Sequence, residues 1–128
     1  MFKFDEDLKK VDDGVWKDFE GSQFLIAHIS NMKFQRALSR LQQPHRRKIE
    51  QGSIDPNLNK RIVAEAMAEG VLLDWKNVGS VAGETPTYTP KLGMTALMKS
   101  VEFRDWVSEI ATNMSNYRDE EISELGND

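Results

Sequence analysis

The side chains that could carry out chemistry are few in this 128-residue sequence. Cysteine is absent, which removes thiolate nucleophiles, disulfides and cysteine metal ligands. The two histidines, His28 and His45, belong to no H-x-x-x-H or H-x-x-E pattern, so the usual zinc arrangements are missing. Gly79-x-x-x-Gly83 lacks the Gly-Lys-Ser/Thr ending of a phosphate-binding loop. The sequence therefore predicts neither a metal site nor a phosphate loop.

The remaining polar residues do not assemble a catalytic pattern. The adjacent pairs Asp12-Asp13 and Glu120-Glu121 lie in polar segments, where neighbouring carboxylates are solvated rather than catalytic. No serine has a His/Asp constellation that is legible in the sequence. His28 lies in an apolar context and is expected to be a satisfied core or edge histidine. We therefore expect no catalytic, cofactor-binding or metal-binding residues, and a protein that is not an enzyme.

Charge is distributed unevenly along the chain. The formal net charge of −4 at pH 7 argues against a dedicated nucleic-acid binder. However, residues 21–49 contain no acidic side chain, and a basic segment over 33–48 falls among them. This asymmetry indicates either a partner site or a solvated face. A nucleic-acid-binding module that uses the basic segment is thus one alternative. Its cations are Lys33, Arg36, Arg40, Arg46, Arg47 and Lys48.

The first half of the chain predicts a hairpin followed by a helix. Residues 15–29 form two apolar and aromatic runs with a Gly-containing turn between them, which is typical of a β-hairpin. A lone hairpin is marginal in water, so it must lie on helices or pair with another chain. Residues 1–14 have no clear pattern. Asn31 predicts the N-cap of a helix through Gln43.

The second half predicts more helices. Asp55-Pro56 is a strong helix start, and the apolar periodicity favours a helix over 55–78 with Gly79 as its stop. Gly70 inside that helix predicts a close approach by another element, because mid-helix glycine is otherwise unfavourable. After a loop rich in Gly, Ser, Thr and Pro, further helices are predicted over 89–99 and 100–117.

These elements place the chain in the α+β class. We expect an N-terminal β-hairpin packed on a bundle of about four helices, mostly α, forming a single globular domain over 1–117. Residues 118–128 are acidic and poor in large apolar groups, which predicts a flexible C-terminal tail. No apolar run approaches the roughly 18 residues of a membrane span, so we expect no membrane partner.

Two segments resemble the tail assembly chaperones of long-tailed (siphovirus-type) bacteriophages. They read LDWKNV over 73–78 and YTPKLGMTALMKSVEFRD over 88–105, and the resemblance extends from Val15 to Ala111. It implies a protein that binds and shields the tape measure protein, a long apolar helical chain. Such a protein promotes tail-tube assembly and is absent from the mature virion. The resemblance also implies self-association and action in the host cytoplasm, the bacterial cytosol during phage assembly.

Large adaptable side chains are compatible with such a role. The chain has three tryptophans and six methionines, and flexible methionine suits surfaces that must fit a partner, although it also fills cores. We expect partner binding by Trp75, Tyr88, Leu92 and Met94. Burial in the core is the alternative for Trp75.

Several families of this kind make a longer form by a −1 ribosomal frameshift. Leu125-Gly126-Asn127 is codable with the slippery heptamer GGGAAAC, so we hypothesise such a form, which would contact the tail-tube protein. Reading the codons tests this hypothesis. A permanent structural protein of the phage neck or tail is a further alternative to a chaperone.

Overall fold

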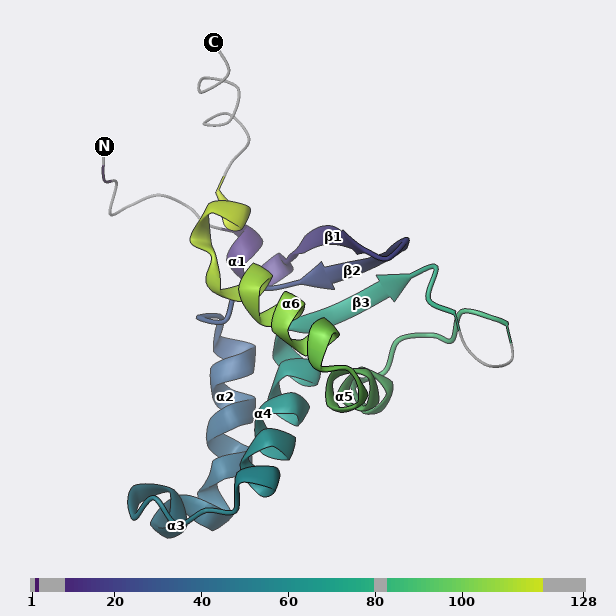
Figure 1. The fold of residues 1–128 in the computed structure, drawn as a ribbon. Coiled ribbons are helices and arrows are strands. Elements are labelled where there is room, and N and C mark those ends of the chain that lie inside the picture. The colour runs from purple at the N-terminus through teal and green to yellow at the C-terminus, as the bar shows by residue number, and fades with distance from the viewer. Residues whose placement is uncertain (1, 3–8, 80–82, 119–128) are drawn as a thin grey trace.

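The computed structural model describes residues 2, 9–79 and 83–118. Within them a three-stranded antiparallel sheet lies beside a set of helices, so the predicted α+β class is confirmed (Figure 1). The elements are α1 (Lys9–Asp13), β1 (Val15–Phe19), β2 (Ser22–Ile26), α2 (Met32–Gln42), the 3-10 turn η1 (Gln43–His45), α3 (Arg46–Glu50), α4 (Pro56–Gly70), β3 (Leu72–Lys76), α5 (Pro90–Lys99), α6 (Val101–Thr112) and the 3-10 turn η2 (Met114–Tyr117).

The predicted hairpin is present as β1 and β2. Its turn, Glu20-Gly21, has φ angles of 51° and 84°. This left-handed pair is what a two-residue type I′ hairpin turn requires, and glycine adopts it without a Cβ penalty. Lys17 lies opposite Phe24 in the antiparallel register.

Strand β2 ends at Ile26, earlier than the predicted boundary at residue 29. The backbone beyond it turns to other partners: Ala27 N–H donates to Val71 O at 2.8 Å, and Ile29 N–H donates to Ala111 O at 2.9 Å. The apolar run therefore continues past the strand because it connects the sheet to the ends of α4 and α6.

The prediction of one helix over 55–78 is wrong in its last third. Helix α4 ends at Gly70, and β3 then pairs antiparallel with β2, with Trp75 opposite Phe24. Gly79 consequently stops no helix. The physical reason is the hairpin, since two strands alone are marginal in water and a third strand stabilises them. Pairing with β2 outweighs the helical spacing of the apolar residues.

The close contact predicted at Gly70 is confirmed, because α2 crosses α4 there. A Cβ placed on Gly70 would collide with the backbone N and Cα of Phe34 and lie 2.8 Å from Phe34 Cβ. Asn31 is the predicted N-cap of α2, and its Oδ1 accepts from Phe34 N–H at 2.9 Å. Its Nδ2 also donates to Gly70 O at 2.8 Å. One side chain therefore caps α2 and joins it to the end of α4.

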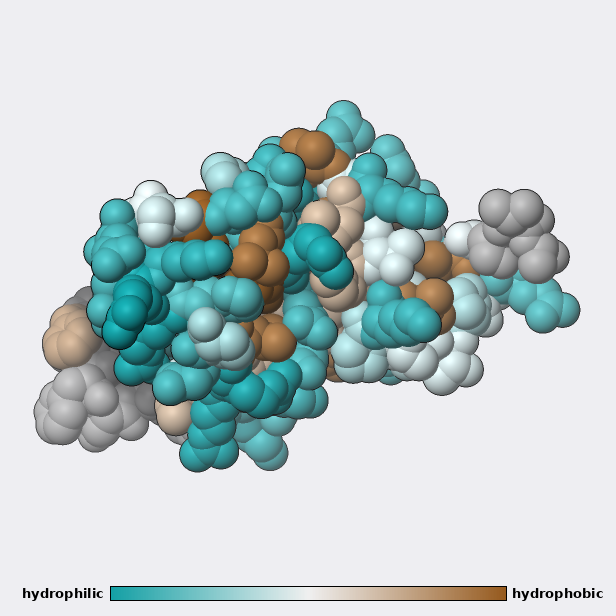
Figure 2. All heavy atoms as spheres, turned by 90° about the horizontal axis from the view of Figure 1, so that it is seen from below, coloured by the Kyte–Doolittle hydropathy of each residue, from teal (hydrophilic) through white to brown (hydrophobic). Residues whose placement is uncertain are grey.

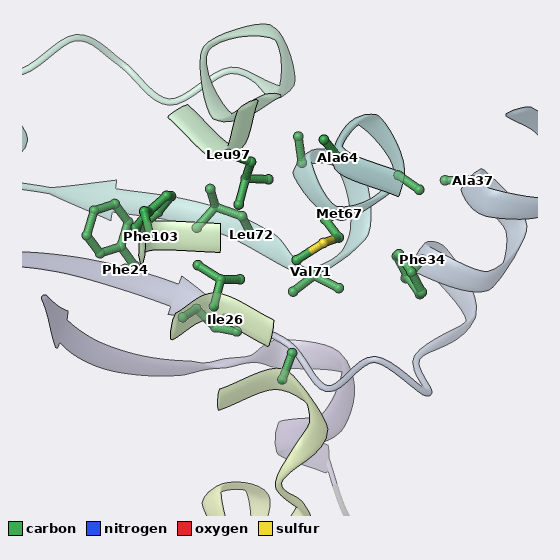
Figure 3. Packing of buried hydrophobic residues seen from close by; sticks show 14 of the residues in the cluster. Phe24, Ile26, Phe34, Ala37, Ala64, Met67, Val71, Leu72, Leu97 and Phe103 are labelled. Atoms are coloured by element: carbon green, nitrogen blue, oxygen red, sulfur yellow. The ribbon is translucent and has the colours of Figure 1, made fainter. Parts of the chain in front are cut away.

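The buried core joins the sheet to α2, α4, α5 and α6 (Figure 3). Leu72 of β3 and Leu97 of α5 are both fully buried in it. Phe24 of β2 and Phe103 of α6 meet with ring centroids 4.8 Å apart. The cluster consists of Phe24, Ile26, Phe34, Ala37, Ala64, Ala66, Met67, Ala68, Val71, Leu72, Trp75, Leu97, Phe103, Val107 and Ala111.

Other element boundaries differ modestly from the prediction. The patternless N-terminus contains the short helix α1, and the basic stretch after α2 forms the 3-10 turn η1 and the short helix α3. Thr89 and Ser100 are the N-caps of α5 and α6, and each side-chain oxygen accepts from the backbone N–H three residues on. Helix α6 ends at Thr112 instead of Tyr117, and η2 covers the remaining apolar positions. The acidic residues 119–128 lie outside the described residues, so the predicted tail stays a prediction.

Candidate partner-binding surfaces

Trp75 and Tyr88 form a clamp that holds the loop before α5 against the body. Their rings meet edge-on with centroids 4.9 Å apart. Trp75 is 7% exposed, and its Nε1–H donates to Pro86 O at 2.7 Å. The Tyr88 Oη lies 2.5 Å from Ala68 O and 2.9 Å from Leu72 O, to either of which its proton can be donated.

The Tyr88 side chain is closely packed, as its pKa and the space beside Gly93 indicate. Burial, together with the nearby Asp74 carboxylate, raises the pKa of the Tyr88 phenol well above its usual value. A Cβ placed on Gly93 of α5 would lie 2.8 Å from the Tyr88 Cε1, so the ring occupies the space that a side chain would need. Of the four predicted partner residues, these two are thus turned inward, and the Trp75 alternative of core burial is confirmed.

Leu92 and Met94 lie on α5, where they are less enclosed. Leu92 is 38% exposed, whereas Met94 is half-buried. Met94 lines a cavity between α4 and the end of α2. The structure therefore brings Trp75 and Tyr88 together as one clamp and places Met94 on a different surface.

Two neighbouring cavities of about 450 and 420 Å³ follow α4 between α2 and α5, and we call them together the α4 groove. They share Arg40 as a lining residue, and Glu65 and Glu69 line one each, one helical turn apart on α4. The remaining lining residues are Lys33, Arg36, Ala37, Leu41, Pro44, His45, Leu58, Arg61, Ile62, Pro90 and Met94.

The α4 groove combines apolar lining with cationic side chains. Arg40 forms an ion pair with Glu69, in which a single nitrogen, Nη2, lies 2.9 and 2.7 Å from the two carboxylate oxygens. An ion pair this exposed contributes only about 0.2–1 kcal/mol. Within the described residues, Lys33, Arg36 and Arg61 form no ion pair. Figure 2, which shows the molecule from below, has apolar residues in patches between hydrophilic ones. The apolar and cationic lining of the α4 groove suits an amphipathic partner.

A second hollow, the aromatic cavity of about 340 Å³, lies where the sheet meets α5 and α6. Phe19, Phe24, Trp75 and Phe103 line it, together with Glu20, Ser22, Val78, Gly79, Ala96, Lys99 and Ser100. The rings also pack on one another, for example Phe19 on Trp106 with centroids 4.8 Å apart. The aromatic side chains thus stabilise the junction of sheet and helices while leaving a small hollow.

His28 is a satisfied core histidine, as predicted. It is 8% exposed, and its Nδ1 accepts from Ser30 N–H at 3.0 Å, which leaves the ring proton on Nε2 in the neutral form. Burial lowers the pKa of His28. Its ring meets Tyr117 edge-on at 5.1 Å. The Tyr117 hydroxyl is buried and has no hydrogen-bond partner among the described residues.

Among residues 9–79 and 83–118, no group of three or more His, Cys, Asp or Glu side chains is placed to hold a metal ion. In the same part of the chain, no helix has the length and apolar character that a membrane span needs.

The fold and its surfaces define a small α+β protein with an open groove between helices. Residues 29–127 match the family model described as YdaY prophage protein. The chain therefore belongs to the YdaY prophage protein family and is of phage origin. This agrees with the phage resemblance at that level and does not specify a role in tail assembly. No curated protein and no solved structure matches the chain.

The α4 groove is the feature that sequence reasoning missed. Lys33, Arg36 and Arg40 belong to the predicted basic segment, and Met94 is a predicted partner residue. What joins them is the packing of α2 and α5 on either side of α4, which no local spacing reveals. The sequence did contain one partial signal for the groove. Ala37 is a small residue with Lys33 and Arg40 one helical turn to either side, and all three line the groove.

Proposed function

We propose that this prophage protein is a tail assembly chaperone. It binds and shields the tape measure protein, promotes assembly of the tail tube around it, and is absent from the mature virion. It acts in the host cytoplasm, without catalysis. Membership of a prophage family and the resemblance of residues 15–111 to such chaperones support this proposal.

The α4 groove is the observation that carries the proposal. A long apolar client must be kept from aggregating, and helix-in-groove contact is the usual way to hold an amphipathic helix. Ala37, Leu41, Ile62 and Met94 offer apolar contacts along the groove. The cations at its rim suit acidic residues on the client's polar side.

The predicted partner residues then divide into two roles. Met94 contacts the client directly, and Leu92 extends the contact surface of α5. Trp75 and Tyr88 act indirectly, because their clamp fixes the loop that sets the position of α5. When α5 is held in place before binding, it loses less conformational freedom on binding the client than a mobile helix would.

A chaperone must also release its client. The groove is open, and its charged rim is solvated, so the charged contacts contribute little free energy each and are easily exchanged. When the client packs into the growing tail tube, the tube can therefore replace the chaperone on the client. A longer frameshifted form would bring the tail-tube protein to the complex, and the codons of Leu125-Gly126-Asn127 test for that form.

Co-expression with the tape measure protein of the same prophage tests the proposal. We expect the tape measure protein to become soluble and to co-purify with the chaperone, and mass spectrometry of purified virions to lack the chaperone. Failure to co-purify would contradict the proposal. Presence in the virion at the copy number of a tail component would favour the structural neck or tail protein instead.

The cations of α2 and α3 favour a second candidate, a nucleic-acid-binding module. Phosphate binding would be strongly salt-dependent, because each neutralised phosphate releases counterions. A mobility-shift titration with DNA and RNA distinguishes the two candidates: the chaperone proposal expects no salt-sensitive shift at micromolar protein.

A further inference from the structure

We propose that a hollow between α4 and α6, here called the α6 hollow, binds an organic carboxylate, an anion carried on a short apolar stem. The hollow has a volume of about 280 Å³. It is separate from the α4 groove, because Met67 lies about half a turn round α4 from Leu58 and Glu69, which line the groove. The proposal does not depend on the proposed function. The hollow is lined by Asn59, Lys60, Val63, Met67, Arg104 and Ser108.

The charge of the α6 hollow is purely cationic. Lys60 of α4 and Arg104 of α6 both line it, and neither forms an ion pair within the described residues. In that part of the chain no carboxylate lines the hollow. An anion between the two cations is therefore attracted by both. The carboxylates nearest to them in sequence all lie outside the lining: Asp55, Glu65, Glu102, Asp105 and Glu109.

The α4 groove differs in this respect. Glu65 and Glu69 line it, and Glu69 is paired with Arg40. Its cationic charge is thus partly balanced by the protein itself. The α6 hollow has fewer cations, but nothing within its lining neutralises them. A single small anion therefore suits the α6 hollow better than the groove.

Hydrogen-bonding capacity is the second argument. Asn59, Arg104 and Ser108 are half-buried, yet their side chains have no hydrogen-bond partner among the described residues. The exposed Lys60 side chain has none there either. All four side chains can donate, and a guanidinium can donate two parallel hydrogen bonds to one carboxylate. A bound carboxylate would supply acceptors to groups that are partly withdrawn from water.

The apolar part of the hollow defines the rest of the ligand. Val63 is half-buried and Met67 is 3% exposed, so together they offer aliphatic contact. Methionine adapts its shape to a neighbour. A volume of about 280 Å³ lies at the lower end for ligand pockets, which suits a short acid or one acidic side chain rather than a helix. A free carboxylic acid and a glutamate side chain of another protein present the same chemistry.

Titration of the full chain with hexanoate tests the proposal, followed by the amide chemical shifts in ¹H–¹⁵N NMR spectra. We expect saturable shifts over residues 59–67 and 104–108 with a Kd of about 1 mM, which is ordinary for a ligand of this size. Hexanamide is the matched control, because it keeps the stem and removes the charge. It should bind about tenfold more weakly or not at all.

A blocked tripeptide, acetyl-Ala-Glu-Ala-amide, distinguishes the two sources of the carboxylate. Binding of the tripeptide at the same residues and with a Kd like that of hexanoate would support the site and assign it to an acidic side chain of a partner protein. Binding of hexanoate alone would support the site and assign it to a free acid.

Paired substitutions test which side chains hold the anion. Lys60→Gln with Arg104→Gln should weaken hexanoate binding about tenfold or more, because both cations are removed. Arg46→Gln with Arg47→Gln is the matched control, since it makes an equal charge change on α3 and should leave binding unchanged. Circular dichroism confirms that both variants are folded. Lys60→Gln alone changes an exposed residue and should still weaken binding severalfold.

Several results would overturn the proposal. One is equal binding of hexanamide and hexanoate, which would leave only an apolar hollow. A second is unchanged hexanoate binding in the folded variant that lacks both cations. A third is shifts in α3 as large as those in α4 and α6, which would show general attraction to basic surface. A fourth is the absence of any saturable shift in α4 and α6.

Discussion

The aromatic end of the molecule and the α4 groove use their side chains in opposite ways. Around Trp75 and Tyr88, rings pack on rings, and both polar groups hydrogen-bond to backbone carbonyls of the same chain. Along the α4 groove, cationic side chains face solvent, and Lys33 and Arg36 are without an ion pair among the described residues. The first region is internally satisfied, and the second retains its capacity to bind.

This difference shows that aromatic content alone is a poor guide to a binding surface. Large rings attract attention in a sequence because they dominate interface energetics, but they dominate cores equally. Here the rings position α5, and the groove depends on that position.

The largest expected effect is at the base of the groove. Gly70→Ala would place a Cβ against the Phe34 backbone, which a side-chain rotation cannot relieve, and should destabilise the protein by at least about 3 kcal/mol. Gly79→Ala is the matched control, since a Cβ there meets nothing within 4 Å and should change stability by less than about 0.5 kcal/mol. Urea unfolding measures both, and equal effects would contradict the crossing of α2 on α4.

A smaller effect is expected at the clamp. Tyr88→Phe keeps the ring but removes the hydroxyl that reaches Ala68 O and Leu72 O, and should cost about 1–2 kcal/mol of unfolding free energy. If the clamp only positions α5, client binding should weaken far less than stability. A variant of wild-type stability that loses the client would instead make Tyr88 a direct contact.

The smallest effect concerns pH. Burial lowers the pKa of His28 in the folded chain, so the unfolded chain takes up the proton at higher pH. Stability should be unaffected above the unfolded value near 6.5, decline as pH falls from there to the folded pKa, and then level off. The slope in that window is at most about 1.4 kcal/mol per pH unit for one proton.

His28→Asn isolates this contribution, because it keeps an acceptor for Ser30 N–H and does not titrate. Urea unfolding between pH 7.5 and 5 should lose the decline in this variant. A decline of the same size in His28→Asn would assign the pH dependence to other groups.

Local signals in the sequence predicted much of the fold for identifiable reasons. Asn31, Thr89 and Ser100 cap helices through their own side chains, and Glu20-Gly21 sets a hairpin turn, so each is readable from short-range chemistry. Gly70 was informative because glycine destabilises a helix, so its presence there indicates a close contact that excludes a side chain. Strand β3 was mistaken for helix because its pairing partner, β2, is far away in the sequence.

The candidate surface was predicted less well, for the same reason. A groove arises from three helices, and the positions of α2 and α5 on α4 follow from packing rather than from any single segment. Met94 was predicted as a partner residue from its flexible side chain, and its place beside a cavity follows from the packing of α5 on α4. Arg61 lies outside the predicted basic segment over 33–48, although it lines the groove from α4.

The most direct test of the α4 groove as the client site is a pair of aspartate substitutions in the tape measure co-purification assay. Met94→Asp places a charge in the groove, whereas Val101→Asp changes a residue that is 59% exposed at the start of α6, outside the groove. We predict at least about a tenfold loss of bound client for Met94→Asp, about 1.4 kcal/mol or more, and none for Val101→Asp. Equal binding by both folded variants would contradict the account.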